Sequence, residues 1–285
     1  MGWAMHEVSL WRVTNDRSWR EVQMTRYAFV LLTSARQQFI YRGELVARFI
    51  QMVLFMGVFM ALWSTAFAVS GQGELQGYTL IEMVWYLAMT ETVALSTSRI
   101  FLEISEAVKS GDLAYTLARP LSYPFFQVAN SLGSSAPRIL LNLLTSSAVV
   151  ALGMRQFAGS LPGFAAFLGL AALALLLDAL IAVLIGLAAF WMEEVMPVYW
   201  IYSKLVFTLG GLFLPLELFP ESLRRAVQWL PFQFITYAPA RAFVKFDPGF
   251  VLQAALGQAA YVALFTALVL LVWRQAQRRM VVHGG

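Results

Sequence analysis

The sequence contains no cysteine, only two histidines and only three lysines among its 285 residues. Without cysteine, neither a disulfide framework nor thiolate chemistry is available. His6 and His283 lie at opposite ends of the chain, so we expect neither a structural metal site nor a Ser-His triad. No lysine follows a glycine, so the phosphate-binding P-loop is absent and we expect no ATP hydrolysis by this chain. The sequence therefore predicts a protein that is not an enzyme.

Charged residues are also scarce. They make up 13% of the chain, while 60% of the residues are hydrophobic, and ordinary soluble domains carry about 25% charged residues. This balance predicts an integral membrane protein, all-α because a helix satisfies its own backbone polar groups in lipid. We expect six transmembrane helices, at about residues 47–69, 78–98, 136–154, 163–192, 195–214 and 250–273.

Arginine and lysine are distributed unevenly around these spans. With both termini in the cytoplasm, fourteen of them lie on the inner side and five on the outer side, and Lys204 lies within a span. The net charge of +4 is then explained by topology and by contact with anionic head groups, so we expect no nucleic-acid partner. The early sequence has no apolar core typical of a signal peptide.

Residues 1–46 precede the first span and are expected to form a cytoplasmic arm. Residues 24–45 place apolar side chains on one stripe of a helix and polar ones opposite, which predicts an amphipathic helix lying along the membrane surface. The alternative is an ordinary cytoplasmic helix packed on the protein. The six-span domain would then run over 47–273, followed by a cytoplasmic tail at 274–285.

The densest charged stretch between two spans is residues 99–124. Phe101, Ile104, Val108 and Leu113 recur at close to helical spacing, with charged residues on the other side. This predicts a short amphipathic helix that Gly111 ends. Its polar face is either a docking surface or simply a solvated face. The charged residues on that face are Glu103, Glu106, Lys109 and Asp112.

Within this stretch, Ser-Gly-Asp-Leu at 110–113, Thr-Leu-Ala-Arg-Pro at 116–120 and the aromatic pair at 125–126 resemble the cytoplasmic loop of type-2 ABC exporter permeases. Asp112 and Ala118 replace the commoner Glu and Leu of that pattern. In that family the loop faces the ATPase subunit, so the resemblance implies a coupling helix between spans two and three. It assigns the coupling role to Glu103, Glu106, Lys109, Gly111, Asp112, Leu113 and Arg119.

Residues 215–249 are too long and too apolar for a simple loop between the fifth and sixth spans, and four prolines punctuate them from Pro220 onward. Leu223, Val227 and Leu230 oppose two arginines and a glutamine, which predicts a short amphipathic helix. The stretch also resembles the outer re-entrant helices of the same permease family. The residues that carry this resemblance are Gly210, Gly211, Pro215, Phe219, Pro220, Leu230, Pro231, Phe232, Tyr237 and Pro239.

Four ionisable residues fall within the expected spans: Glu82, Glu91, Asp178 and Lys204. A charge at mid-membrane costs about 2.5–3.5 kcal/mol on insertion scales, so each should face protein or water or be neutralised. Glu82 lies close enough to the outer end of its span to reach head groups. Asp178 shares its helix face with small residues, which indicates a helix interface. There it either lines a substrate path, pairs with Lys204, or accepts a buried hydrogen bond from a neighbouring helix.

The resemblance implies a permease subunit of an ATP-driven exporter in the bacterial inner membrane. Its partners would be ABC ATPase subunits, which bind ATP and Mg²⁺, and a second permease, identical or paralogous. The family exports drugs and other small molecules, and a mostly apolar path fits a small amphipathic or hydrophobic substrate. The alternative from another class is a proton-coupled secondary transporter using Glu91 and Asp178, but the two halves of the chain show no convincing internal similarity.

Overall fold

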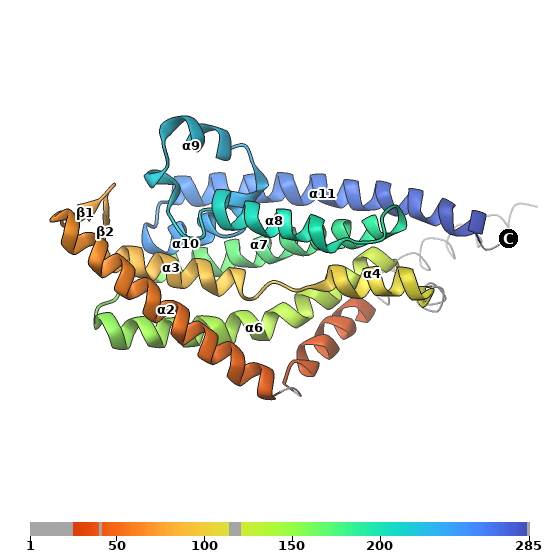
Figure 1. Ribbon diagram of the computed structural model, residues 1–285, viewed down its shortest axis with the longest axis horizontal. Coiled ribbons are helices and arrows are strands. Elements are labelled where there is room, and N and C mark those ends of the chain that lie inside the picture. Colours follow the sequence, from red (N-terminus) through yellow and green to blue (C-terminus); the bar gives the residue numbers. More distant parts are fainter. Residues whose placement is uncertain (1–24, 40–41, 114–120, 284–285) are drawn as a thin grey trace, which may run out of the picture.

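The computed structural model describes residues 25–39, 42–113 and 121–283, and these parts are almost entirely helical (Figure 1). A first helix covers residues 25–37. The elements that follow are α2 (Arg42–Ser70), β1 (Glu74–Leu75), β2 (Tyr78–Thr79), α3 (Leu80–Ala94), α4 (Ile100–Ser110), α6 (Tyr123–Met154), α7 (Leu161–Leu187), η1 (Ala188–Phe190), α8 (Met196–Leu209), η2 (Leu216–Leu218), α9 (Glu221–Val227), η3 (Pro231–Phe234), α10 (Tyr237–Val244) and α11 (Pro248–His283).

Four helical segments are long and apolar enough to cross a membrane: Val46–Ser70 in α2, Tyr123–Met154 as α6, Leu161–Phe190 as α7 with η1, and Pro248–Arg279 in α11. They match four of the six predicted spans. The second and fifth predicted spans form shorter helices. At a rise of 1.5 Å per residue, the 15 residues of α3 and the 14 of α8 extend for about 23 and 21 Å.

The segments that continue α3 and α8 are irregular, yet their carbonyl groups have partners. Beyond α8, the carbonyl oxygen of Gly210 accepts from the amide of Tyr237 at 3.1 Å and from the hydroxyl of Thr236 at 2.6 Å. The carbonyl of Gly211 accepts from Tyr86, and that of Leu212 accepts from the hydroxyl of Thr90 at 2.9 Å. This is the condition under which irregular backbone is tolerated at membrane depth.

The central element of the fold is α7. In the most apolar part of its span, 67% of the residues are buried, compared with 28% for α2 and 11% for α11. It packs against α11, α10, α4 and α6, and the contact is close because its faces carry small side chains such as Ala171, Ala174 and Ala182. The outer helices, in contrast, present much of their apolar surface outward, which is what a lipid-facing helix requires.

The two ends of the molecule differ (Figure 1). At one end lie α4, the helix over residues 25–37 and the last turns of α11, and we refer to it as the α4 end. The β1–β2 hairpin lies at the opposite end, the hairpin end. Its turn residues Gln76 and Gly77 have φ of 51° and 79°, as a two-residue hairpin loop requires. The sequence analysis did not predict these strands.

The helix expected over residues 24–45 is interrupted, because residues 38 and 39 form a turn and α2 begins at Arg42. Residues 25–37 and α2 then point in different directions (Figure 1). One face of the first helix packs on α6: a Cβ atom added at Gly133 would lie 2.3 Å from the carbonyl oxygen of Leu31. The other face exposes Phe29 and Leu32. The helix is therefore packed on the protein and also presents an apolar stripe.

Two helices extend beyond the predicted spans. The third span was expected from residue 136, but α6 begins at Tyr123, with Pro124 in its first turn, where a missing N–H costs no intrahelical bond. Pro137 lies inside the same helix. A tail was expected from residue 274, but α11 continues without a break to His283. Residues 191–195, in contrast, separate η1 from α8 and include the turn predicted at Glu193 and Glu194.

Candidate functional site

The charged stretch after the second predicted span folds as α4, an amphipathic helix of 11 residues. Phe101 and Ile104 are fully buried, which is worth about 1.5–3 kcal/mol for each side chain relative to exposure to water. The helix ends at Gly111, whose φ of 80° lies in the left-handed region that glycine adopts without strain. The amphipathic helix and its terminator are thus as predicted.

The buried face of α4 packs on α7 at Gly186. A Cβ atom added there would lie 2.7 Å from the Cβ of Ile104, so only glycine leaves room for this side chain. The small residues on this face of α7 therefore allow α4 to pack closely against it. Ile100 and Ile104 belong to one buried cluster with Leu180, Val183 and other α7 side chains.

α4 also contacts the beginning of α8. The ring of Phe101 stacks on that of Tyr199, with centroids 4.0 Å apart and planes inclined by 16°. Nearer the end of the helix, Lys109 Nζ lies 2.8 Å from Glu194 Oε1 in the turn before α8. This ion pair is exposed, and pairs of that kind contribute only about 0–1 kcal/mol. The stacked rings therefore contribute more to the α4–α8 contact than this ion pair does.

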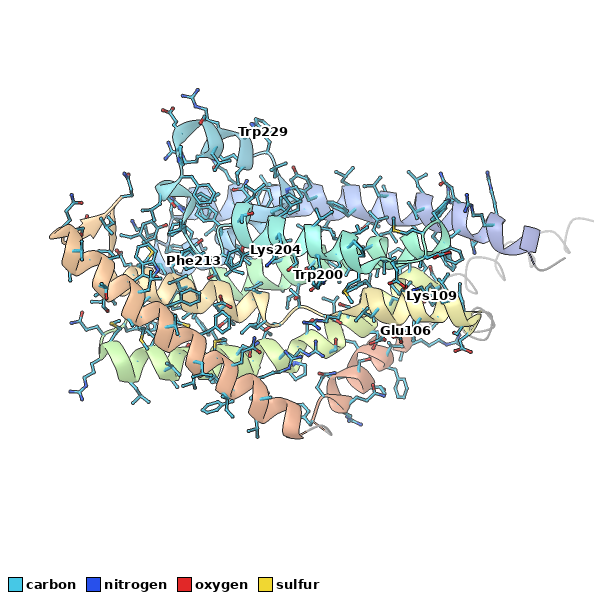
Figure 2. The ribbon with its side chains drawn as sticks, in the orientation of Figure 1. Glu106, Lys109, Trp200, Lys204, Phe213 and Trp229 are labelled. Carbon is cyan, nitrogen blue, oxygen red and sulfur yellow. The ribbon has the colours of Figure 1, made fainter. Side chains whose placement is uncertain are left out.

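Asp178 anchors α8 to α7 from the other side. The hydroxyl of Tyr202 donates to Asp178 Oδ1 at 2.6 Å, and both side chains are buried. The predicted alternative of a buried hydrogen bond is confirmed. The alternative ion pair with Lys204 is wrong, because Lys204 is exposed and its Nζ lies 5.9 Å from the ring centroid of Phe207. Lys204 follows Tyr202 by two residues, a rotation of about 200° around the helix, so the two side chains leave α8 in nearly opposite directions (Figure 2 labels Lys204).

A polar ridge on α6 holds the segment between α3 and α4. Its members recur every four residues, the spacing that aligns side chains along one ridge of a helix. Asn142 Nδ2 donates to Ser96 Oγ at 3.0 Å, and the hydroxyls of Ser146 and Thr92 are 2.9 Å apart. The ridge consists of Asn130, Ser134, Arg138, Asn142 and Ser146. Sequence reasoning missed it, although the four-residue repeat in the third span was a signal.

The other face of α4 is exposed and charged. Glu106 and Lys109 lie on it (Figure 2), and Asp112 follows beyond the end of the helix. Glu103 differs from them because its Oε2 accepts from Asn130 Nδ2 at 3.1 Å. Partial burial raises the pKa of Glu103, although the hydrogen bond from Asn130 acts in the opposite direction. Leu113 is buried, whereas Arg119 lies outside the described residues.

The two glutamates of α3 have different environments. Glu82 closes a capping box: its carboxylate accepts from the amide of Thr79 at 2.8 Å, and the Thr79 hydroxyl accepts from the amide of Glu82. It therefore has a structural role, which the Thr-x-x-Glu spacing could have indicated. Glu91 is 3% exposed. Within the described residues, no hydrogen bond connects its side chain to Asp178, whose Oδ1 accepts from Tyr202.

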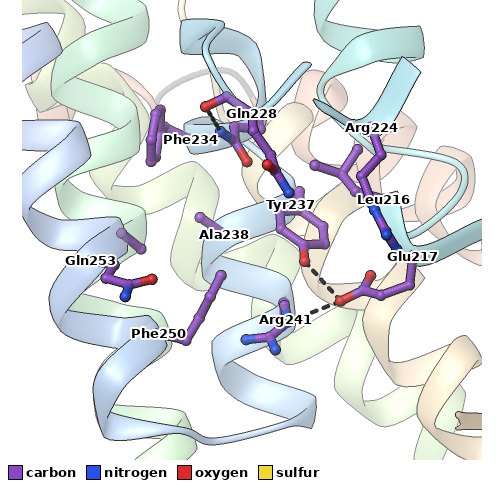
Figure 3. Close-up of a pocket in the computed structure, with 12 residues that line it drawn as sticks. Leu216, Glu217, Arg224, Gln228, Phe234, Tyr237, Ala238, Arg241, Phe250 and Gln253 are labelled. Atoms are coloured by element: carbon purple, nitrogen blue, oxygen red, sulfur yellow. Dashed lines mark hydrogen bonds and ion pairs between the residues drawn. The ribbon is translucent and has the colours of Figure 1, made fainter. Parts of the chain in front are cut away.

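At the hairpin end, an ion pair fastens α10 to η2. Glu217 Oε1 accepts from the Tyr237 hydroxyl at 2.8 Å and from Arg241 Nε at 3.0 Å (Figure 3). The guanidinium of Arg241 lies 3.8 Å from the ring centroid of Phe250 on α11. Burial, followed by the charge of Glu217, raises the pKa of Tyr237, so its hydroxyl remains a donor. These residues line a cavity of about 510 Å³.

The arrangement defines a class of protein: an integral membrane protein whose central helix is mostly buried and carries a charged amphipathic helix across one end. A family model described as ABC-2 family transporter protein matches residues 44–284. Since this match spans most of the chain, the protein belongs to the ABC-2 transporter family, and the resemblance seen in the sequence is confirmed. It is a membrane permease of the ABC transporter class. No curated protein matches the chain.

Proposed function

We propose that this chain is the permease subunit of an ATP-driven exporter, which moves a small amphipathic or hydrophobic substrate outward. ATP and Mg²⁺ are bound by a separate ATPase subunit that docks on the exposed face of α4. The observation that carries the proposal is the contrast between the two faces of α4. One face is buried on α7 and α8, and the other presents Glu106 and Lys109.

Movement of α4 is transmitted through its buried face. The Phe101–Tyr199 stack joins α4 to α8, and Ile104 joins it to α7 at Gly186. When ATP closes the two ATPase subunits, each α4 is displaced together with the start of α8. Glu103 is part of this transmission because it binds Asn130 on α6. Glu106, Lys109, Gly111, Asp112 and Arg119 belong to the docking surface, and Leu113 packs beneath it.

We propose six membrane crossings, with α3 and α8 completing the four long ones. The irregular segments after these two helices extend the crossing, and protein side chains satisfy their carbonyls, as is the case for Leu95, Gly210 and Leu212. Both termini lie in the cytoplasm, and α9, η3 and α10 form the outer re-entrant region. The helix over residues 25–37 lies in the inner interface, with Phe29 and Leu32 toward lipid.

A second permease, identical or paralogous, covers part of the outward surface of α2 and α8. Of the residues of α8, Tyr202 alone is buried. Trp200 and Ile201, the two residues before it, are 65% and 63% exposed. Phe49 and Leu54 on α2 are 56% and 63% exposed. Large apolar side chains exposed on both helices are typical of an interface or a lipid-facing surface.

The first experiment expresses the chain with its neighbouring genes, purifies it through a tag on this chain, and measures the ATPase that co-purifies. Glu106→Arg, which reverses the charge on the exposed face of α4, should release the ATPase or lower its activity about tenfold or more. Glu74→Arg, an exposed glutamate at the hairpin end, is the matched control and should leave ATPase activity unchanged. If no ATPase binds the wild-type chain in mild detergent, the proposal is wrong.

A further inference from the structure

The cavity beside the Glu217–Arg241 ion pair lies between η2, α9, η3, α10 and α11 (Figure 3). We refer to it as the hairpin-end cavity. Its volume of about 510 Å³ lies within the range of about 300–1,000 Å³ that is usual for small-molecule sites. The ion pair occupies one wall only, so fastening α10 to η2 does not explain the space beside it.

The polar lining of the hairpin-end cavity is rich in amides. Gln228, Gln233 and Gln253 contribute one carboxamide each, and every carboxamide carries an acceptor oxygen and two N–H donors. Gln253 comes from α11, Gln233 from η3 and Arg224 from α9. A ligand in the cavity therefore meets hydrogen-bond donors and acceptors from several elements of the fold.

Several of these groups have no partner within the described structure. Gln233 is 8% exposed, and its Nε2 donates to the carbonyl oxygen of Gln228 at 2.6 Å, while no described donor binds its Oε1. Neither the amide of Gln253 nor the guanidinium of Arg224 makes a hydrogen bond or an ion pair with a described residue. The cavity therefore presents hydrogen-bonding groups that the fold does not use.

The ion pair itself leaves one donor and one acceptor unused. Glu217 Oε1 accepts from both Tyr237 and Arg241, whereas Glu217 Oε2 and Arg241 Nη1 are buried without a partner among the described residues. Buried polar atoms without partners are costly. A hydroxyl group both donates and accepts, so one hydroxyl beside the ion pair can satisfy both atoms. A water molecule does the same but fills only about 30 Å³ of the cavity.

The charges of the lining are mixed in sign. Glu217, Arg224 and Arg241 border the same space. An anionic head group meets Glu217 there, and a cationic head group meets the two arginines. A neutral head group with many hydroxyls avoids both conflicts and matches the amides, because each hydroxyl donates and accepts. The lining therefore favours a sugar over a phosphate or an ammonium group.

The apolar part of the lining leads along α11. Phe234 and Phe250 line the cavity, and their rings offer apolar surface to the C–H face of a sugar ring. On α11, Leu256 follows Gln253 by three residues and Leu264 follows it by eleven, so the three side chains lie close to one face of the helix. Both leucines are exposed. An apolar tail attached to the sugar therefore has a path from the cavity along α11.

We propose that the hairpin-end cavity binds the sugar head group of a glycosylated amphiphile. Two sources share this chemistry: a membrane glycolipid that stays bound, and a transported substrate that carries a sugar on an apolar tail. The binding itself follows from the cavity alone. The location of the cavity on the outer side of the membrane, and any role in transport, rest on the proposed function.

The test of binding uses the purified chain alone in dodecyldimethylamine oxide, a detergent without hydroxyl groups. Dodecyl maltoside is titrated, and its binding is followed by native mass spectrometry. Octaethylene glycol monododecyl ether has the same tail and a neutral head without sugar rings, and is the ligand control. We expect the maltoside to bind at least about tenfold more tightly than the ether. Equal binding of the two would overturn the proposal.

Two variants test whether the maltoside binds in the cavity. Gln253→Leu and Arg224→Met each remove a side chain that makes no hydrogen bond with a described residue, so both variants should fold. Each should weaken maltoside binding about fivefold. The matched controls are Gln72→Leu at an exposed position and Arg225→Met, whose arginine pairs with Glu221 outside the cavity lining. Equal losses in the cavity variants and the controls would refute the site.

A second arm separates the two sources in vesicles that hold the permease together with its ATPase. ATP-dependent movement of a fluorescent dodecyl maltoside across the bilayer, lost in Gln253→Leu, would identify the amphiphile as a substrate. Binding without movement would identify it as a resident glycolipid, and the site would stand. If no ATPase associates with the chain, the exporter proposal fails, while the binding measurement on the chain alone still decides this one.

Discussion

The hydrogen bond from Tyr202 to Asp178 provides a direct test of how α8 is held. Tyr202→Phe removes the donor and leaves a buried carboxylate without this partner, whereas Asp178→Asn keeps an acceptor oxygen at the same position. If the role of Asp178 is structural, Tyr202→Phe should destabilise the protein more than Asp178→Asn does. Transport by the Asp178→Asn variant should remain close to that of the wild type.

The expected magnitude follows from the burial and charge of the acceptor. Interhelical hydrogen bonds in membranes have coupling energies of about 0.6 kcal/mol on average and about 1.7 kcal/mol at most. This bond is 2.6 Å long and its acceptor, Asp178, is 6% exposed, so we expect a coupling near the upper limit, about 1.5 kcal/mol. For a chain of this size, that corresponds to a shift in Tm of roughly 3–6 °C.

The assay is a double-mutant cycle on Asp178→Asn and Tyr202→Phe, with thermal unfolding in detergent followed by tryptophan fluorescence. Tyr261→Phe is the matched control, because the hydroxyl of Tyr261 donates to the carbonyl of Trp229 in an exposed setting. A Tm shift for Tyr202→Phe no larger than that of the control would refute the structural role. Loss of transport in a stable Asp178→Asn variant would instead show that the carboxylate charge is used.

Three further predictions concern other parts of the molecule. Gly186→Val should force Ile104 away, destabilise the fold by about 1–3 kcal/mol and release the ATPase. Gly169→Val on the same helix is the control and should be tolerated, because a Cβ atom added at Gly169 meets no atom within 4 Å. Thermal unfolding measures the stability of both variants, and co-purification measures their ATPase binding. Because partial burial raises the pKa of Glu103, the folded chain holds this proton more tightly than the unfolded chain. The contribution of protonated Glu103 to the stability of the fold is complete below the ordinary carboxyl pKa of about 4.3. It is lost as the pH rises through the raised pKa of Glu103 in the folded chain. A profile of Tm between about pH 4 and 7 should become flatter in Glu103→Gln, and an unchanged profile would contradict the assignment. Arg241→Met leaves Glu217 without its ion pair and should cost about 1–2 kcal/mol, more than Arg224→Met in the same cavity, as measured by thermal unfolding.

Local signals in the sequence predicted the local structure well. The periodicity of Phe101 and Ile104 indicated α4, and Gly111 indicated its end, because both depend only on neighbours within one or two turns. The same holds for the long apolar spans and for the helix between Pro220 and Pro231. The Thr79–Glu82 capping box was equally local but was overlooked.

The candidate site could be predicted only in part, because its contacts join residues far apart in the sequence. Asp178 could be placed at a helix interface from its small neighbours, but its partner Tyr202 lies 24 positions away, and both Tyr202 and Lys204 were available on α8. Distance along the chain also concealed the cavity that Arg48, Arg99 and Arg138 line together. Side-chain pattern gives the face of a helix, while the partner on that face depends on how the helices cross.

The contacts around α8 indicate which element moves when α4 is displaced. α8 is held to the body by the Phe101–Tyr199 stack near its start and by Tyr202–Asp178 one turn later. α7 is buried along most of its length, so moving it would break far more contacts than moving α8. At its other end α8 meets Gly210 and Gly211, and the φ of 70° at Gly211 is one that glycine adopts freely. A push on Tyr199 should therefore tilt α8 about the Tyr202–Asp178 bond while α7 stays in place. Because Arg99 and Tyr199 line one cavity, such a tilt would also change the shape of that cavity.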